Sequence, residues 1–140
     1  MDQKRTITIE SVVNVPRQKA WEFWTQPEHI VQWAFASDDW EAPAAENDLR
    51  VGGKFKTVMA AKDKSSQFDF TGVYTDVKEH QLIEYTIEDG RRVSLKFDDT
   101  RDATKITETF EPFPSYTEEQ ERSGWEAVLG NFKKYAESHK

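Results

Sequence analysis

The chain has 140 residues, a length that suits one domain of ordinary size, and contains no cysteine. The lack of cysteine excludes disulfides, thiolate metal sites and a cysteine nucleophile. Asp and Glu (26) outnumber Lys and Arg (19), and the formal net charge is -7. Because nucleic-acid binding depends on a basic surface, this balance argues against DNA or RNA as a partner.

Aromatic residues supply much of the apolar bulk, with 5 Trp, 4 Tyr and 9 Phe. Each can bury ~150–250 Å², so a small number of them could build a core beneath a very polar surface. The first ten residues lack the apolar stretch of a secretory signal, and no apolar run approaches the ~20 residues needed to cross a bilayer. We therefore expect a single domain over residues 1–140, cytoplasmic and not inserted in a membrane.

The N-terminal part of the chain predicts one strand and two short helices. Residues 5–13 alternate between apolar and polar side chains, as in a strand with one buried face. Pro16 ends this strand and suits the first turn of a helix over residues 17–25. Pro27 ends that helix and starts a shorter one over residues 28–33.

The segment 34–48 is rich in Ala, Asp, Glu and Pro and is typical of a loop. It nevertheless contains Phe35 and Trp40, and it follows Trp33. Loops with large aromatic residues are either anchored in the core or line the mouth of a binding site. Both positions stay open for these three residues.

Residues 52–110 alternate strand patterns with turns. Gly52-Gly53 and Asp89-Gly90 predict tight turns, and residues 62–67 (KDKSSQ) predict a hairpin loop. Gly72 interrupts one strand pattern and is a candidate bulge. With the first strand, the sheet should have six to seven antiparallel strands, the later ones over 54–59, 68–77, 83–87, 93–97 and 104–110.

The C-terminal residues predict one long amphipathic helix. Thr117 and Gln120 have the spacing of a capping box, and apolar residues recur at the helical period as far as about His139. No other long element can cover the apolar face of the sheet. A sheet curled around one helix leaves a space near the helix end, and small ligands bind in such cavities. The pattern predicts an α+β fold with a hydrophobic cavity.

Short motifs in a fixed order carry a family resemblance: Pro16 with Ala20-Trp21, Pro27-Glu28 with Trp33, DLRVGGKF at 48–55, FTGVY at 70–74, and Ser123-Gly124-Trp125 with Leu129. Together they resemble bacterial proteins similar to the C-terminal domain of the activator of Hsp90 ATPase. That family belongs to the START-like (helix-grip, Bet v 1-like, polyketide cyclase-like) superfamily, and the likeness covers roughly residues 5–138. It implies a curved antiparallel sheet around the last helix, two short helices after the first strand, and a deep cavity for lipids, polyketides, flavonoid-like or other hydrophobic molecules.

The candidate ligand-binding residues are mostly aromatic, and such residues also form ordinary packed cores. A cavity wall is itself part of the core, so the two interpretations overlap. The candidates are Trp24, Trp33, Phe35, Trp40, Phe55, Met59, Phe70, Tyr74, Tyr85, Phe97, Glu108 and Trp125.

Among these candidates, Glu108 is the residue best suited to acid–base chemistry. Strand alternation places it between Ile106 and Phe110, on the inner face. A buried carboxylate is costly unless it is paired, and otherwise takes up a proton. Glu108 is thus a candidate polar anchor for a ligand or a candidate catalytic acid. Alternatively, a bulge turns it outward, or it forms a hydrogen bond with Tyr74 or Tyr85.

Other catalytic and metal-binding patterns are missing from the sequence. His29, His80 and His139 are far apart, without the short spacing of metal ligands or the partners of a Ser-His-Asp triad. Gly52-Gly53 lacks the residues of a phosphate-binding loop. We expect no metal and no cofactor.

Three functional hypotheses follow. The first is a monomeric carrier or sensor of a small hydrophobic molecule. The second is a cyclase or dehydratase that uses Glu108 or a cavity tyrosine, ranked lower because the sequence offers no catalytic dyad. The third, suggested by the resemblance, is an Hsp90-type co-chaperone or stress-response protein. Because the likeness is to one domain of the activator, ATPase stimulation by this chain alone is doubtful.

Overall fold

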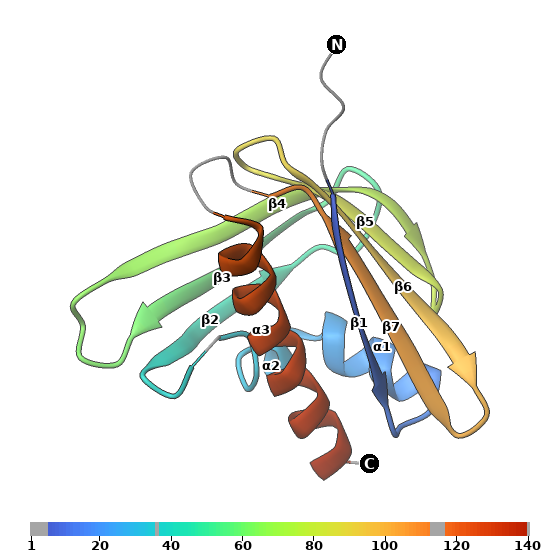
Figure 1. The fold of residues 1–140 in the computed structure, drawn as a ribbon. Coiled ribbons are helices and arrows are strands. Elements are labelled where there is room, and N and C mark those ends of the chain that lie inside the picture. The colour runs from blue at the N-terminus through green and yellow to red at the C-terminus, as the bar shows by residue number, and fades with distance from the viewer. Residues whose placement is uncertain (1–5, 36, 113–116, 140) are drawn as a thin grey trace.

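The computed structural model describes residues 6–35, 37–112 and 117–139. The elements follow the predicted order of a strand, two short helices, a run of strands and a long helix (Figure 1). They are β1 (Ile7–Val13), α1 (Arg17–Thr25), α2 (Pro27–Ile30), β2 (Trp40–Asn47), β3 (Lys54–Ala61), β4 (Gln67–Lys78), β5 (Leu82–Ile87), β6 (Arg92–Thr100), β7 (Ala103–Phe110) and α3 (Glu118–Ser138).

The strands form a seven-stranded antiparallel sheet in the order β1-β7-β6-β5-β4-β3-β2. Strands β2 to β7 pair with their neighbours in sequence, and β1 pairs with β7. The sheet curves around α3, and α1 and α2 lie near the C-terminal end of that helix (Figure 1). The helix-grip prediction is therefore confirmed.

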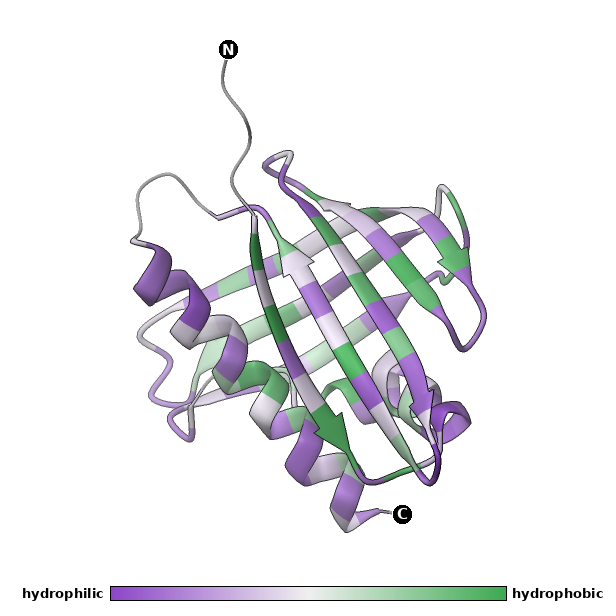
Figure 2. Cartoon of the chain, turned by 45° about the vertical axis from the view of Figure 1, so that its right-hand side comes forward, coloured by the Kyte–Doolittle hydropathy of each residue, from purple (hydrophilic) through white to green (hydrophobic). Residues whose placement is uncertain are grey.

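Alternation of side chains separates the two faces of the sheet. In β7, Thr104, Ile106, Glu108 and Phe110 are buried, whereas the residues between them are partly exposed. Apolar and polar residues alternate in the same way along other strands (Figure 2). The inner face of β7 therefore provides apolar core residues together with two polar ones, Thr104 and Glu108.

The expectation of a loop over residues 34–48 was wrong, because β2 occupies Trp40–Asn47. Its pattern was concealed by Pro43 and by a shift in register between Glu41 and Ala44. As an edge strand, β2 pairs only with β3, so a proline without an N–H group is tolerated there. The second helix is also shorter than expected and ends at Ile30.

The bulge expected at Gly72 was also misplaced. Gly72 pairs in regular register with Phe55, and the irregularity of β4 falls between Tyr74 and Asp76. The glycine is instead required by close packing, since an added Cβ would lie 2.6 Å from Cε2 of Phe55. Gly72 thus leaves room for the Phe55 ring, which packs directly against its backbone.

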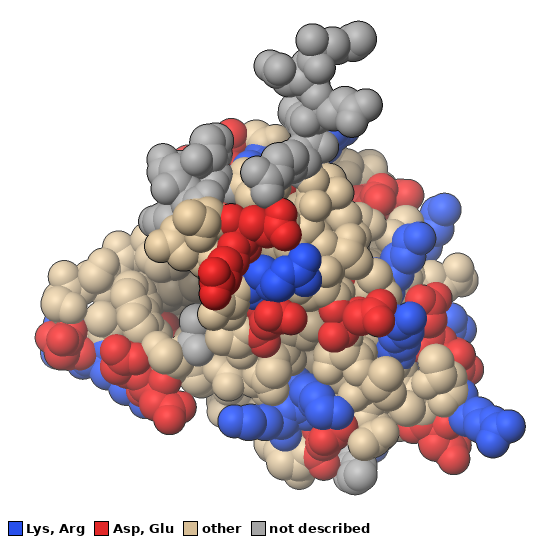
Figure 3. Space-filling model, in the orientation of Figure 1, with Lys and Arg blue, Asp and Glu red and all other residues tan. Residues whose placement is uncertain are grey.

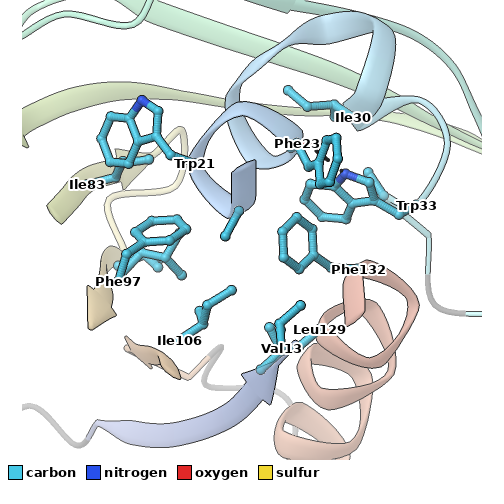
Figure 4. Packing of buried hydrophobic residues seen from close by; sticks show 14 of the residues in the cluster. Val13, Trp21, Phe23, Ile30, Trp33, Ile83, Phe97, Ile106, Leu129 and Phe132 are labelled. Carbon is cyan, nitrogen blue, oxygen red and sulfur yellow. Dashed lines mark hydrogen bonds between the residues drawn. The ribbon is translucent and has the colours of Figure 1, made fainter. Parts of the chain in front are cut away.

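A cluster of buried hydrophobic residues lies between α1, the sheet and the C-terminal half of α3 (Figure 4). Phe132 is fully buried, and its ring centre lies 4.7 Å from that of Trp24 and 4.9 Å from that of Trp33. Phe97 packs edge-on against Trp21, with ring centres 5.3 Å apart. The Phe132 contacts join α3 to α1 and to Trp33, and the Phe97–Trp21 contact joins α1 to β6.

Helix α3 begins with the predicted capping box. The Thr117 hydroxyl accepts a hydrogen bond from the Gln120 N–H (3.1 Å), and the Gln120 side chain accepts one from the Thr117 N–H (2.9 Å). Acidic and basic side chains are interspersed over the face shown in Figure 3. Among the described helices, none combines the length and hydropathy required of a membrane span.

Candidate functional site

A cavity of about 480 Å³ lies between the sheet and the N-terminal half of α3. The inner faces of β3, β4, β5 and β7 form one wall, the α1–α2 region forms another, and Gly124, Trp125 and Val128 of α3 complete it. The surface is hollowed between α3 and the β3–β4 side of the sheet (Figure 3). Small-molecule sites typically have volumes of ~300–1,000 Å³, so the cavity is large enough for a ligand.

Most of the predicted ligand-binding residues lie together in this wall: Trp24, Trp33, Phe55, Met59, Phe70, Tyr74, Tyr85, Glu108 and Trp125. Three others lie outside it. Phe97 is 1% exposed within the filled core, and Trp40 packs on Phe68 with ring centres 5.9 Å apart. Phe35 is partly buried against the core, and its carbonyl accepts a hydrogen bond from Asn131 of α3.

Aromatic contacts hold the part of the wall formed by β3, β4 and β5 in place. The centre of the Phe55 ring lies 4.9 Å from that of Tyr85, in an edge-on contact, and 5.3 Å from that of Tyr74. Across the cavity, Trp125 stacks on Phe110 with ring centres 4.2 Å apart and planes 11° from parallel. These contacts anchor the rings to the sheet without filling the space between the sheet and α3.

Glu108 lines the cavity and is only 3% exposed. Its pairing with Ile9 and Leu95 is regular, which excludes a bulge that turns it outward. Within the described residues, its carboxyl group forms no hydrogen bond or ion pair with Tyr74, Tyr85 or any other side chain. Burial raises the pKa of Glu108 to about 8, because the ionised form loses its hydration.

Comparisons with known proteins place the chain in a family. Residues 14–137 match the family model described as activator of Hsp90 ATPase homolog 1-like protein. The chain belongs to this family. No curated protein matches the chain.

Solved structures agree with this family assignment. The solution structure of an AHSA1-like protein from Aeromonas hydrophila is 38% identical, with a TM-score of 0.92 over 96% of this chain and 94% of that chain. Chr148 from Cytophaga hutchinsonii is 49% identical, with a TM-score of 0.82 over 96% of this chain and 93% of that chain. Protein NE0264 from Nitrosomonas europaea, 18% identical, matches in fold with a TM-score of 0.81, covering 99% and 98% of the two chains.

In this member of the Hsp90-activator-like family, the wall also contains polar residues that the sequence analysis missed. Arg91 donates from Nε to Asp89 Oδ2 (2.8 Å) and from Nη1 to Glu121 Oε1 (3.2 Å). The indole N–H of Trp125 donates to Glu121 Oε2 (3.2 Å). The sequence predicts a turn at Asp89-Gly90, directly before Arg91. The partner of Arg91 on α3, Glu121, is distant in sequence, so only the fold reveals their contact.

A second set of hydrogen bonds, through Tyr74 and Asn47, joins β4 to β2. The Tyr74 hydroxyl donates to Asn47 Oδ1, and Asn47 Nδ2 donates to the Thr25 carbonyl (2.6 Å). Burial raises the pKa of Tyr74, so the hydroxyl stays protonated at neutral pH. Asn47 was missed because its segment was interpreted as a loop.

The remaining titratable residues suggest no metal site. Across the described ranges, no three His, Asp or Glu side chains gather in a geometry that could hold a metal ion. His29 instead contacts the Tyr135 hydroxyl, and His80 packs edge-on against Trp21. The chemistry available in the cavity is therefore that of aromatic rings and Glu108, with a polar margin at Arg91 and Asn47.

Proposed function

We propose that the protein is a carrier or sensor that binds one small, largely apolar molecule in this cavity. The observation that carries the proposal is a space of about 480 Å³ walled by aromatic side chains from both the sheet and the helices. Burial of an apolar ligand there is favourable by roughly 25 cal/mol per Å² of surface removed from water. Lipid-, polyketide- and flavonoid-like compounds have the size and apolarity that this space accepts, and a cytoplasmic location suits such a carrier.

Two glycines on α3 offer a matched test. Gly124 lines the cavity, whereas Gly130 lies on the same helix outside the wall. An added Cβ would meet nothing within 4 Å at either position. Gly124→Leu should therefore occupy the cavity entrance without distorting the helix, and Gly130→Leu is the control.

The probe is N-phenyl-1-naphthylamine, a neutral dye whose fluorescence rises in apolar surroundings. We expect the wild type and Gly130→Leu to bind one equivalent, with energy transfer from the wall residues Trp24, Trp33 and Trp125. Gly124→Leu should bind about tenfold more weakly, as steric loss of ~1.4 kcal/mol implies. Equal binding by both variants, or no binding by the wild type, would contradict the proposal.

An enzymatic role is the second candidate, and Glu108 is the observation that favours it. A cavity-lining acid whose pKa burial raises to about 8 can hold or release a proton near neutral pH. A cyclase or dehydratase of this kind would lose turnover in Glu108→Gln while keeping its fold and ligand affinity. If both turnover and affinity were unchanged once a substrate is in hand, this role would be ruled out.

A chaperone-related role rests on the family alone. The family description refers to activation of the Hsp90 ATPase. If this protein acts in that way, the Hsp90 of its host should co-purify with it and hydrolyse ATP faster in its presence. An ATPase rate unaffected by an excess of this protein would refute that role and leave the cavity proposal intact.

A further inference from the structure

Several donors in the cavity wall are already used within the protein. The Trp33 indole N–H donates to the Phe23 carbonyl (3.0 Å), and the Trp125 indole N–H donates to Glu121 (3.2 Å). The Tyr74 hydroxyl also donates to a protein group. A ligand rich in acceptor oxygens would therefore compete with these internal bonds.

The charged groups of the wall are mostly acidic. In the described wall, Arg91 is the single cationic residue, against the acids Glu46, Glu108 and Glu121. Arg91 is held by Asp89 at 2.8 Å and by Glu121 at 3.2 Å. An anionic ligand would meet a cation whose charge is already balanced, whereas a positive charge would be attracted.

Glu108 adds a specific acceptor for that charge. Its carboxyl group is almost fully buried, lines the cavity and has no hydrogen-bond partner among the described residues. Burial and, next, the ionised form of Glu108 raise the pKa of the neighbouring Tyr85, whose ring packs edge-on against Phe55 with ring centres 4.9 Å apart. Aromatic rings attract cations through their negative faces, and an ion pair with a desolvated carboxylate adds to that attraction.

We propose that the ligand carries one cationic nitrogen on an apolar body, with the nitrogen beside Glu108 and the body among the aromatic rings. This inference rests on the proposed function, because it specifies the ligand class of the same cavity. It distinguishes a lipophilic ammonium compound from a neutral or anionic hydrophobic compound of the same size.

Binding of a cation should be coupled to proton release. Burial raises the pKa of Glu108 to about 8, so at pH 7 the empty cavity holds a largely protonated acid. A cation bound beside it favours the carboxylate, and the proton leaves to solvent. A neutral ligand that accepts a hydrogen bond from the acid would retain that proton. The other charged and titratable groups that face the cavity are Glu46 of β2, Tyr74 of β4, Tyr85 of β5, Arg91, and Glu121 of α3.

The experiment compares three probes with one aromatic body: (1-naphthylmethyl)trimethylammonium, 1-naphthylmethanol and 1-naphthoate. The first carries a permanent charge and no titratable proton. Calorimetry at pH 7 in two buffers with different ionisation enthalpies measures affinity and proton exchange together. We expect the ammonium probe to bind about tenfold more tightly than the alcohol, with the carboxylate weakest, and to release about one proton.

Glu108→Gln isolates the acid responsible. In this variant, the ammonium probe should bind about as weakly as the alcohol and should release no proton. The control is Glu22→Gln, an exposed residue of α1 that changes the net charge equally and should alter neither measurement. Far-ultraviolet circular dichroism establishes that each variant is folded, and the proton release of the wild type tests the inference without any variant.

The outcomes separate the two proposals. If the alcohol or the carboxylate binds as tightly as the ammonium probe, or if the ammonium probe releases no proton, the cation is the wrong ligand class and the cavity proposal stands. If none of the probes binds, and the naphthylamine dye also fails, both proposals are overturned.

Discussion

Glu108 occupies a position where an ionised side chain destabilises the folded protein. The residues beside it on the inner face of β7, Ile106 and Phe110, are fully buried. Burial raises the pKa of Glu108 to about 8, against an ordinary value near 4.5. The folded protein thus holds a proton that the unfolded chain releases at a lower pH, and this difference couples stability to pH.

The sign of this coupling is testable. Between about pH 5 and pH 8, the unfolded chain binds fewer protons at Glu108 than the folded protein, so the free energy of unfolding falls as pH rises. The loss should be on the order of 1 kcal/mol per pH unit and should be absent in Glu108→Gln. Urea unfolding at pH 5, 6.5 and 8 measures it. A constant difference between variant and wild type across this range would contradict the assigned protonation.

Gly72 shows a second constraint at the level of one residue. An added Cβ would lie 2.6 Å from the Phe55 ring and 2.7 Å from the Thr86 carbonyl, which is backbone and cannot turn away. Gly72→Ala should therefore destabilise the protein by ~1–3 kcal/mol, as overpacking does. The control is Gly130→Ala, which has open space and should stabilise α3 by ~0.5–1 kcal/mol. Equal midpoints of urea unfolding for the two variants would refute this account.

Among the elements, α3 was the most predictable and β2 the least. The helix carries its signals locally, in the capping box at Thr117 and in the apolar positions that recur along it. Strand β2 carries Pro43 and a shift in register, and it forms because β3 offers it a partner. Local sequence cannot reveal that partner, so Asn47, which β2 brings to the cavity, was missed as well.

The cap of α3 makes a prediction for this element. Thr117→Ala removes the hydroxyl that accepts from the Gln120 N–H and should destabilise the protein by ~1 kcal/mol. Ser123→Ala, at an exposed position further along the helix, is the control and should change stability by less than ~0.5 kcal/mol. Thermal unfolding followed by circular dichroism compares the two. If Thr117→Ala matches the control, the cap contributes nothing to stability.

At the scale of the whole molecule, one helix serves two different regions. Its C-terminal half packs into the dense core, where Phe132 is fully buried between Trp24 and Trp33. Its N-terminal half borders the cavity with Trp125 and Val128. The order of elements and the family motifs predicted the helix-grip fold, but they could not show where packing is complete. That boundary depends on how side chains from distant strands meet, which explains why Phe97 lies in the core and not in the cavity wall.

This division predicts unequal effects of truncation along α3. Phe132→Ala should cost ~3–5 kcal/mol, because it opens a new void in a filled core. Val128→Ala, at the edge of an existing cavity, should cost about 1 kcal/mol or less. The measurement is the free energy of unfolding in urea. Similar losses for both variants would show that the two halves of the helix are packed alike.

The edges of the sheet limit its growth into larger assemblies. Along β1, α3 supplies cations to outward backbone carbonyls: Arg122 donates to the Thr8 carbonyl (3.1 Å) and Lys133 to the Val12 carbonyl (2.6 Å). At the opposite edge, Pro43 interrupts the row of N–H donors on β2. Neither edge therefore offers an incoming strand an uninterrupted row of free backbone donors and acceptors. Intermolecular strand addition, the first step towards fibrils, is disfavoured at both edges.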